Sequence, residues 1–407
     1  MRWLVMVSVV CLACFMGCEP PKPSANAKPT NAGPVVVPSG PVAALPPLSD
    51  AQKDLFVKRM LSIARGENQP QDFLDADQLF SRTADIVGVP SAQRSAFING
   101  TKQGYANNTL AKIVVAETSK GGTFHFLRFS KRDGFETAIF RFIRSDTALS
   151  YFEFAMPPSN ATNFGVAPDV YAYISSEWMS QTSANVTLQL RAAEDPSVLN
   201  KLFRSTGFST SDANTFKTLI DKGKVQDWRG VITGYHALPA AMKQSKICLM
   251  FRFNAATRLQ DNAEITSVVE DLRKHCGNEA GIEFLSLDYY LIRKEYGKAM
   301  NSLDGLERII GQDPYIDVLR GNISLQAGDI DQALAAGKRA AEREPTLEAA
   351  QMLLATAALS KSDFASLASA FRALQKMGKV TVADVEGNAA YAQFRESPEF
   401  AAWRNGR

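Results

Sequence analysis

The chain of 407 residues has few metal-binding side chains and little excess charge of either sign. It contains 3 His and 5 Cys, too few and too scattered for an array of zinc fingers. Lys and Arg number 45 against 42 Asp and Glu, and the net charge of +3 argues against nucleic acid as an electrostatically held partner. Nucleophile-elbow, Walker, zinc-protease and dinucleotide motifs are missing, so the sequence predicts no catalytic residue, metal or cofactor.

What the sequence does contain is enough apolar residues for two folded domains. The hydrophobic fraction is 45% and the charged fraction 21%, a balance typical of globular chains rather than disordered ones. The patterns described below predict an α+β domain over residues 49–190 and an all-α solenoid over 211–378. A helical connector over 191–210 joins them, and capping helices over 379–407 follow the solenoid.

The N-terminal segment, up to Cys18, has the pattern of an export signal. An apolar run over residues 3–16 has the length of a signal-peptide hydrophobic region and is short for a membrane-spanning helix of roughly 20 residues. Gly17 and Cys18 end the run, and this resembles the signal of bacterial lipoproteins, in which a small residue precedes an acylated Cys. The resemblance implies lipid attachment at Cys18, with Cys14 as the rival position. A plain cleaved signal and an uncleaved anchor are the alternatives.

Residues 19–48 have the composition of a tether. Nine of them are Pro, which favours the extended polyproline II conformation at about 3.1 Å per residue. Such a segment directly after an acylated Cys would hold a folded domain away from a membrane. We therefore expect a lipid-anchored protein of the cell envelope, with the outer membrane or the periplasmic face favoured.

Residues 211–378 repeat with a period of 34. Three apolar positions of each repeat stand at i, i+4 and i+7, on one face of a helix, and an acidic residue just before that helix can cap its N-terminus. The rows are Val231, Ile265, Ala299, Ala333 and Leu367; Tyr235, Val269, Leu303, Gly337 and Phe371; Leu238, Leu272, Leu306, Ala340 and Leu374; and the acids Asp227, Asp261, Glu295, Asp329 and Asp363.

A helical hairpin that recurs at this period resembles the tetratricopeptide repeat (TPR). The clearest copy spans Pro314 to Arg343, where Gly321, Ala333 and Ala340 occupy the small-residue positions of that family. The resemblance implies five repeats whose first helices line a concave groove. It also implies an unknown protein or peptide as the partner, and a binding function in place of an enzymatic one.

One polar row lies on the first helix of successive repeats. Asn254, Asp288, Asn322 and Thr356 recur once per repeat among apolar neighbours, and such groups can hydrogen-bond the backbone of an extended peptide. Arg258, one helical turn beyond Asn254, is the nearest basic residue. The alternative is that this row is ordinary solvated surface.

The region before the repeats has a helical part followed by a β-prone part. Helical patterns end near Ala116, and β-prone segments separated by short turns follow, which predicts a four-stranded antiparallel meander packed on helices. The expected helices cover 50–65, 73–87 and 91–116, and the expected strands cover 123–129, 137–143, 149–156 and 166–174.

This arrangement resembles the cystatin-like or nuclear-transport-factor-like cone. Phe140-Arg141, Tyr151-Phe152 and Asp169-Val170-Tyr171 match segments of bacterial proteins that combine such a module with TPRs. A small-molecule pocket inside the cone is the alternative function, and a cone-fold enzyme is less favoured. Asp169 with Arg128 or Arg141 would line such a pocket or form a structural ion pair.

Two cysteines remain once the signal region is set aside. Cys248 is expected to begin the first helix of a repeat and Cys276 to end the second helix of that repeat. In an oxidising compartment they could form a disulfide, and two buried thiols are the equally ordinary alternative.

Overall fold

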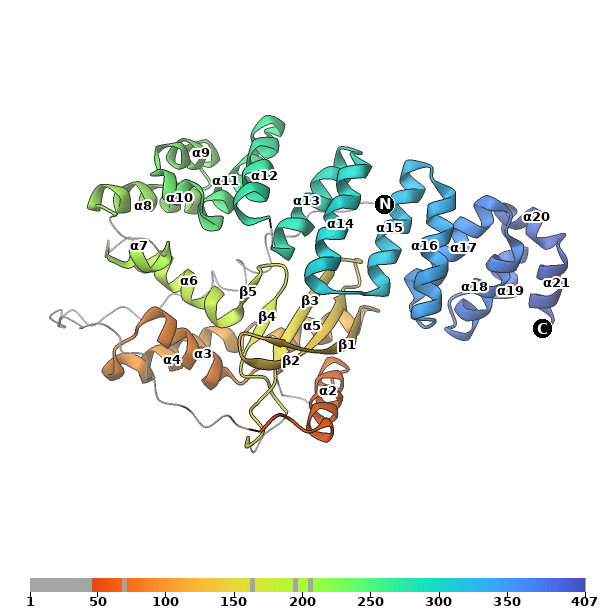
Figure 1. The fold of residues 1–407 in the computed structure, drawn as a ribbon, viewed down its shortest axis with the longest axis horizontal. Coiled ribbons are helices and arrows are strands. Elements are labelled where there is room, and N and C mark those ends of the chain that lie inside the picture. The colour runs from red at the N-terminus through yellow and green to blue at the C-terminus, as the bar shows by residue number, and fades with distance from the viewer. Residues whose placement is uncertain are drawn as a thin grey trace. The chain divides into compact units, whose positions relative to one another are not determined.

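The computed structural model describes residues 46–67, 72–161, 165–192, 197–203, 208–277 and 279–406 (Figure 1). Cys18 and the predicted tether up to residue 45 lie outside these residues. The described chain divides into two compact units, the first ending at Cys276 and the second beginning at Gly277. This division falls inside the range 211–378 that the sequence assigns to one array.

Helices precede the sheet in the first unit, as predicted: α2 (Asp50–Ala64), α3 (Ala76–Val87), α4 (Ser91–Ala106) and α5 (Leu110–Thr118). A capping box starts α2, because the Ser49 hydroxyl accepts the N–H of Gln52 and the Gln52 side chain accepts the N–H of Ser49. The single helix expected over 91–116 is in fact two helices. Thr109 begins the second of them by accepting the N–H of Lys112.

The described strands form one antiparallel meander in the order β1-β2-β3-β4-β5. They are β1 (Thr123–Arg132), β2 (Phe135–Ile143), β3 (Leu149–Ala155), β4 (Val170–Ala172) and β5 (Glu177–Trp178). The sequence did not predict the short β5, and β4 is shorter than expected. Between β1 and β2, Asp133 and Gly134 have φ of 49° and 83°, the left-handed conformations that a two-residue hairpin turn favours.

Phenylalanine rings fill the space between the helices and one face of the sheet. Phe140 and Phe154 are completely buried, and the Phe124 ring stacks on Phe140 with 4.8 Å between centroids. Phe73, just before α3, packs against Phe124 and Phe154 at 5.2 and 5.4 Å. Apolar side chains of α2, α3 and α5 complete this core.

Helix α6 (Met179–Ala192) follows the sheet and packs against α3. The sequence did not predict it. The Ser180 hydroxyl and N–H both donate to the buried Asp169 carboxylate, at 2.5 and 3.2 Å, and this joins the start of α6 to the end of the sheet. Helix α7 (Ser197–Leu202) lies within the predicted connector.

Five helical hairpins are present in the described part of residues 210–376. We call the first helix of each hairpin helix A and the second helix B. Two hairpins belong to the first unit and three to the second, and within each unit consecutive hairpins pack on one another. A short helix, α10 (Ala240–Lys243), precedes the second hairpin. The pairs are α8 (Thr210–Lys224) and α9 (Trp228–Ala237), α11 (Lys246–Leu259) and α12 (Asn262–Cys276), α13 (Ala280–Ile292) and α14 (Tyr296–Ile310), α15 (Pro314–Ala327) and α16 (Ile330–Arg343), and α17 (Glu348–Lys361) and α18 (Phe364–Lys376).

The predicted apolar rows lie on helix B and are buried, except for the half-buried Ile265. The acidic row caps these helices in four of the five hairpins, where the Asp side chain accepts backbone N–H groups of the first turn. Glu295 differs, because its carboxylate forms ion pairs with Arg293 at 2.6 Å and Lys298 at 2.7 Å.

Short helices follow the last hairpin: α19 (Val382–Glu386), the 3₁₀ turn η1 (Ala389–Tyr391), α20 (Ala392–Arg395) and α21 (Pro398–Arg404). Phe394 and Trp403 are buried, and their rings lie 5.8 and 5.3 Å from that of Phe371 on α18. This aromatic cluster covers the apolar face of α18.

Candidate functional site

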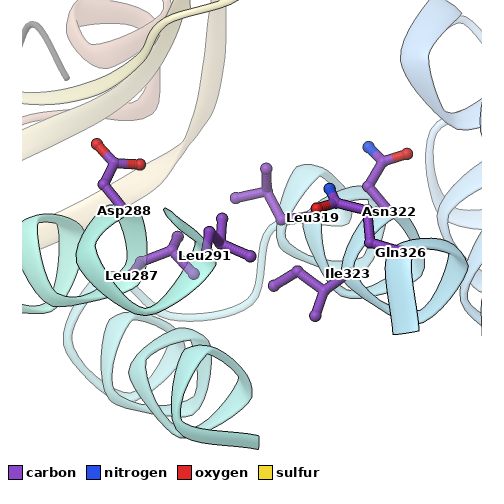
Figure 2. A pocket seen from close by; sticks show the side chains of 7 residues that line it. All are labelled: Leu287, Asp288, Leu291, Leu319, Asn322, Ile323 and Gln326. Carbon is purple, nitrogen blue, oxygen red and sulfur yellow. The ribbon is translucent and has the colours of Figure 1, made fainter. Parts of the chain in front are cut away.

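The second unit has a small cavity between two neighbouring A helices, α13 and α15. Its volume is about 30 Å³, room for about one water molecule or the end of an aliphatic side chain. Figure 2 shows the apolar side chains of α13 opposite those of α15, with Asp288 and Asn322 on either side of them. The lining residues are Leu287, Asp288, Leu291, Leu319, Asn322, Ile323 and Gln326.

Two members of the predicted polar row, Asp288 and Asn322, therefore lie at the same cavity. They occupy equivalent positions of successive A helices, so the repeat itself brings them to one surface. Thr356, the next member, is exposed on α17, and its hydroxyl donates within the helix to the Met352 carbonyl at 2.9 Å.

Close helix packing fixes the walls of this site. A side chain at Gly305 on α14 would overlap the Glu283 carboxyl group on α13. One at Gly321 on α15 would overlap the Leu353 side chain on α17. The small-residue position predicted at Gly321 thus allows adjacent A helices to approach each other.

Asp288 is half-buried, and no described residue forms a hydrogen bond or ion pair with its carboxylate. Burial raises the pKa of Asp288 from 3.8 to about 6, since the charged form loses hydration and gains no partner. Asn322 is also half-buried and has no hydrogen-bond partner among the described residues. The site consequently offers one acidic acceptor and one amide that a ligand could satisfy.

The other predicted groove residues belong to the first unit. Asn254 is half-buried on α11, and Arg258 is exposed in the last turn of the same helix.

A buried arginine between α11 and α12 was missed from the sequence. The Arg252 guanidinium, 5% exposed, contacts Glu264 and Asp271 at 2.6 Å each and donates to the Ser267 hydroxyl at 2.8 Å. It also lies over the Tyr235 ring, 5.0 Å from the centroid. Because every contact is internal to the hairpin stack, this cluster is structural. Acids spaced along α12 were its only sequence signal.

A second internal ion cluster joins α15 to α16. The buried Asp317 carboxylate lies 3.1 Å from both Arg339 and Arg343. In the tetratricopeptide pattern that these hairpins resemble, an aromatic residue is common at the position of Asp317, which here forms an ion pair.

Asp169 is a buried acid of the α+β region, which the sequence placed either in a pocket or in a structural ion pair. The Asp169 carboxylate forms an ion pair with Arg82 of α3 at 3.1 Å. This is a structural ion pair, one of the two outcomes that the sequence allowed, with an arginine that the sequence did not name. Phenylalanines occupy the space between helices and sheet.

A shallow hollow of about 270 Å³ lies on the surface of this region, beside the start of the described chain. Its Glu136 carboxylate lies 3.5 Å from the Lys53 ammonium and accepts the N–H of Leu48 at 3.2 Å. The charges of the hollow are thus largely satisfied by the protein itself.

Cys248 and Cys276 are not joined by a disulfide. Cys248 is completely buried in the first turn of α11, and burial raises the pKa of its thiol to about 12. Such a thiol has almost no thiolate to enter disulfide chemistry at neutral pH. Cys276 is the last residue of α12 and is half-buried.

Among the described residues, no group of three or more His, Cys, Asp and Glu side chains is arranged to hold a metal ion. His125 lies in β1, His236 in α9 and His275 in α12, in agreement with the sequence. None of the described helices has the length and apolar character needed to span a membrane.

No protein-family model and no curated protein sequence matches the chain. Among solved structures, the MamA protein aligns over 41% of this chain and 94% of its own, with 13% identity and a TM-score of 0.33. The type IV pilus biogenesis factor PilW aligns over 48% and 99%, with 14% identity and a TM-score of 0.29. TTC0263, a thermophilic TPR protein of Thermus thermophilus, aligns over 46% and 100%, with 17% identity and a TM-score of 0.27. The assignment of TPR-like hairpins rests on the sequence period and the helix pairs described above.

Proposed function

We propose that this chain is a lipid-anchored scaffold of the cell envelope that binds a protein or peptide through the A helices of its TPR-like hairpins. The observation that carries the binding function is the α13–α15 cavity. There Asp288 and Asn322 stand without internal partners beside an apolar gap. Buried polar groups are normally satisfied, so an unpaired acid and an unpaired amide at one cavity are the feature expected of a ligand site.

The anchoring half of the proposal rests on the sequence of the N-terminal region. An acyl chain on Cys18 and the Pro-rich segment after it would leave the folded units free to meet a partner at some distance from the membrane. The outer membrane or the periplasmic face is the expected location.

The binding half is tested by capturing partners after cross-linking in the native envelope. Asn322→Ala should reduce capture of the partner identified with the wild type. Loss of one hydrogen bond should cost roughly 0.5–1.5 kcal/mol of binding free energy. Asn301→Ala is the matched control, because Asn301 is exposed on the B helix α14. Unchanged affinity in a folded Asn322→Ala variant would move the interaction away from Asn322.

A further inference from the structure

Asp288 is unusual among the acidic side chains of the second unit. Many of its neighbours in that unit are paired with cations across the helix interfaces, whereas no described cation approaches Asp288. The paired acids are Asp304 and Glu307 with Arg320, Asp317 with Arg339 and Arg343, Asp331 with Lys361, Glu348 with Lys379, and Asp363 with Lys338.

The surroundings of Asp288 limit which kind of ligand could supply a positive charge to pair with its carboxylate. A single carboxylate with one amide nearby is too small a ligand set for a protein-bound divalent metal ion. The gap between Leu291 and Leu319 beside it is apolar and admits only the end of a side chain. An aliphatic residue next to a cationic one satisfies both features.

Further apolar side chains lie on the A helices of the second unit. Ile292, at the end of α13, is 65% exposed, and Met352 on α17 is 50% exposed. Leu325 on α15 and Leu359 on α17 are half-buried and occupy the positions equivalent to Leu291 in the next two repeats. The polar row of the A helices is therefore accompanied by apolar side chains over three hairpins.

We propose that this surface binds an extended, cationic peptide segment, in which a Lys or Arg pairs with Asp288 and a neighbouring aliphatic side chain enters the α13–α15 gap. The amide of Asn322 would hydrogen-bond the peptide backbone in the next repeat. The inference rests on the proposed binding function and adds the charge of the partner. An acidic segment would place like charges together at Asp288 and is excluded by the same argument.

The test uses the full chain and three sets of synthetic hexapeptides, acetylated and amidated at their ends. Each peptide has Leu next to one fixed position that is Lys, Gln or Glu, and its other positions are random mixtures of Gly, Ala and Val. The Lys set should bind at least roughly tenfold more tightly than the Gln set, and the Glu set should bind most weakly. In Asp288→Asn this order should collapse. In Asp304→Asn, which removes an equal charge on α14, it should persist.

The outcomes separate this inference from the function on which it depends. Equal binding of the Lys and Gln sets by the wild type, with loss of both in Asn322→Ala, would overturn the cationic preference and leave peptide binding intact. A Lys preference that survives in Asp288→Asn would also overturn the assignment to Asp288. Absence of binding by all three sets would remove both the inference and the proposed site.

Discussion

Replacing Asp288 by Asn should stabilise the protein at neutral pH and lose that effect in acid. The pKa of the folded-state carboxyl is raised to about 6 by burial, against 3.8 for the unfolded chain. Because the pKa is raised in the folded state, folding favours the protonated carboxyl. The contribution of Asp288 to the free energy of unfolding is therefore fully present below pH 3.8 and is lost as the pH rises through 6. At 1.36 kcal/mol per pKa unit the loss is at most about 3 kcal/mol, and partial exposure of the side chain reduces it to about 1–2 kcal/mol.

Urea unfolding of the wild type and Asp288→Asn at pH 4, 5, 6, 7 and 8 measures this difference. Asn has the shape of Asp without its charge, so the variant should gain stability relative to the wild type from pH 4 to about 7 and remain level above that. The other titrating groups are common to both proteins and cancel. A difference that does not change with pH, or one that grows toward acid, would refute the reasoning.

Three further predictions follow from the described residues and the N-terminal sequence. Cys18→Ser should block processing or release the protein from membranes in a fractionation experiment, and unaltered attachment would refute lipidation at Cys18. Gly337→Ala should destabilise the protein by about 1–2 kcal/mol in denaturant unfolding, because its methyl would lie 3.0 Å from the Leu354 Cα. Gly297→Ala should instead stabilise it by up to about 1 kcal/mol, because the added methyl meets no atom within 4 Å. Trp403→Ala should cost about 3–5 kcal/mol and make residues 379–407 the first site of limited proteolysis. Trp403→Phe should cost less, since it removes a buried indole N–H that lacks an acceptor; equal loss in both variants would argue against ring packing as the cause.

The hairpins could be predicted from sequence because the same pattern of apolar and acidic residues recurs in each repeat. Val231 and three of its four equivalents are buried, Ile265 is half-buried, and an acid precedes the position in each copy. Because the pattern recurs in five copies, a single departure from it, such as Asp317, does not obscure the period. The polar row was predictable for the same reason, since Asp288 and Asn322 share one register.

Features that depend on distant contacts could not be predicted. The break between α4 and α5 required Thr109 to be recognised as a cap inside a continuous helical pattern. Helix α6 has small and polar residues, including Ser180 and Ser183, on its buried face, so its apolar periodicity is weak. The partner of Asp169 is an arginine 87 positions earlier, and the sequence contains nearer candidates. The absence of a cation beside Asp288 depends on all the residues that pack around it. These residues are known only once the helices are packed together.

The aromatic cap has a consequence for how such a chain can change in length during evolution. The rings of Phe394 and Trp403 pack on Phe371 of the last described B helix, and Phe400 packs on both of them. The described array therefore ends in a surface that another hairpin cannot use. A duplicated hairpin added after residue 406 would meet this closed end. The same hairpin inserted before α17 would find on both sides the surfaces that it already fits. Extension beyond α18 would therefore require the loss of these rings, whereas a hairpin inserted before α17 would leave the C-terminal end unchanged.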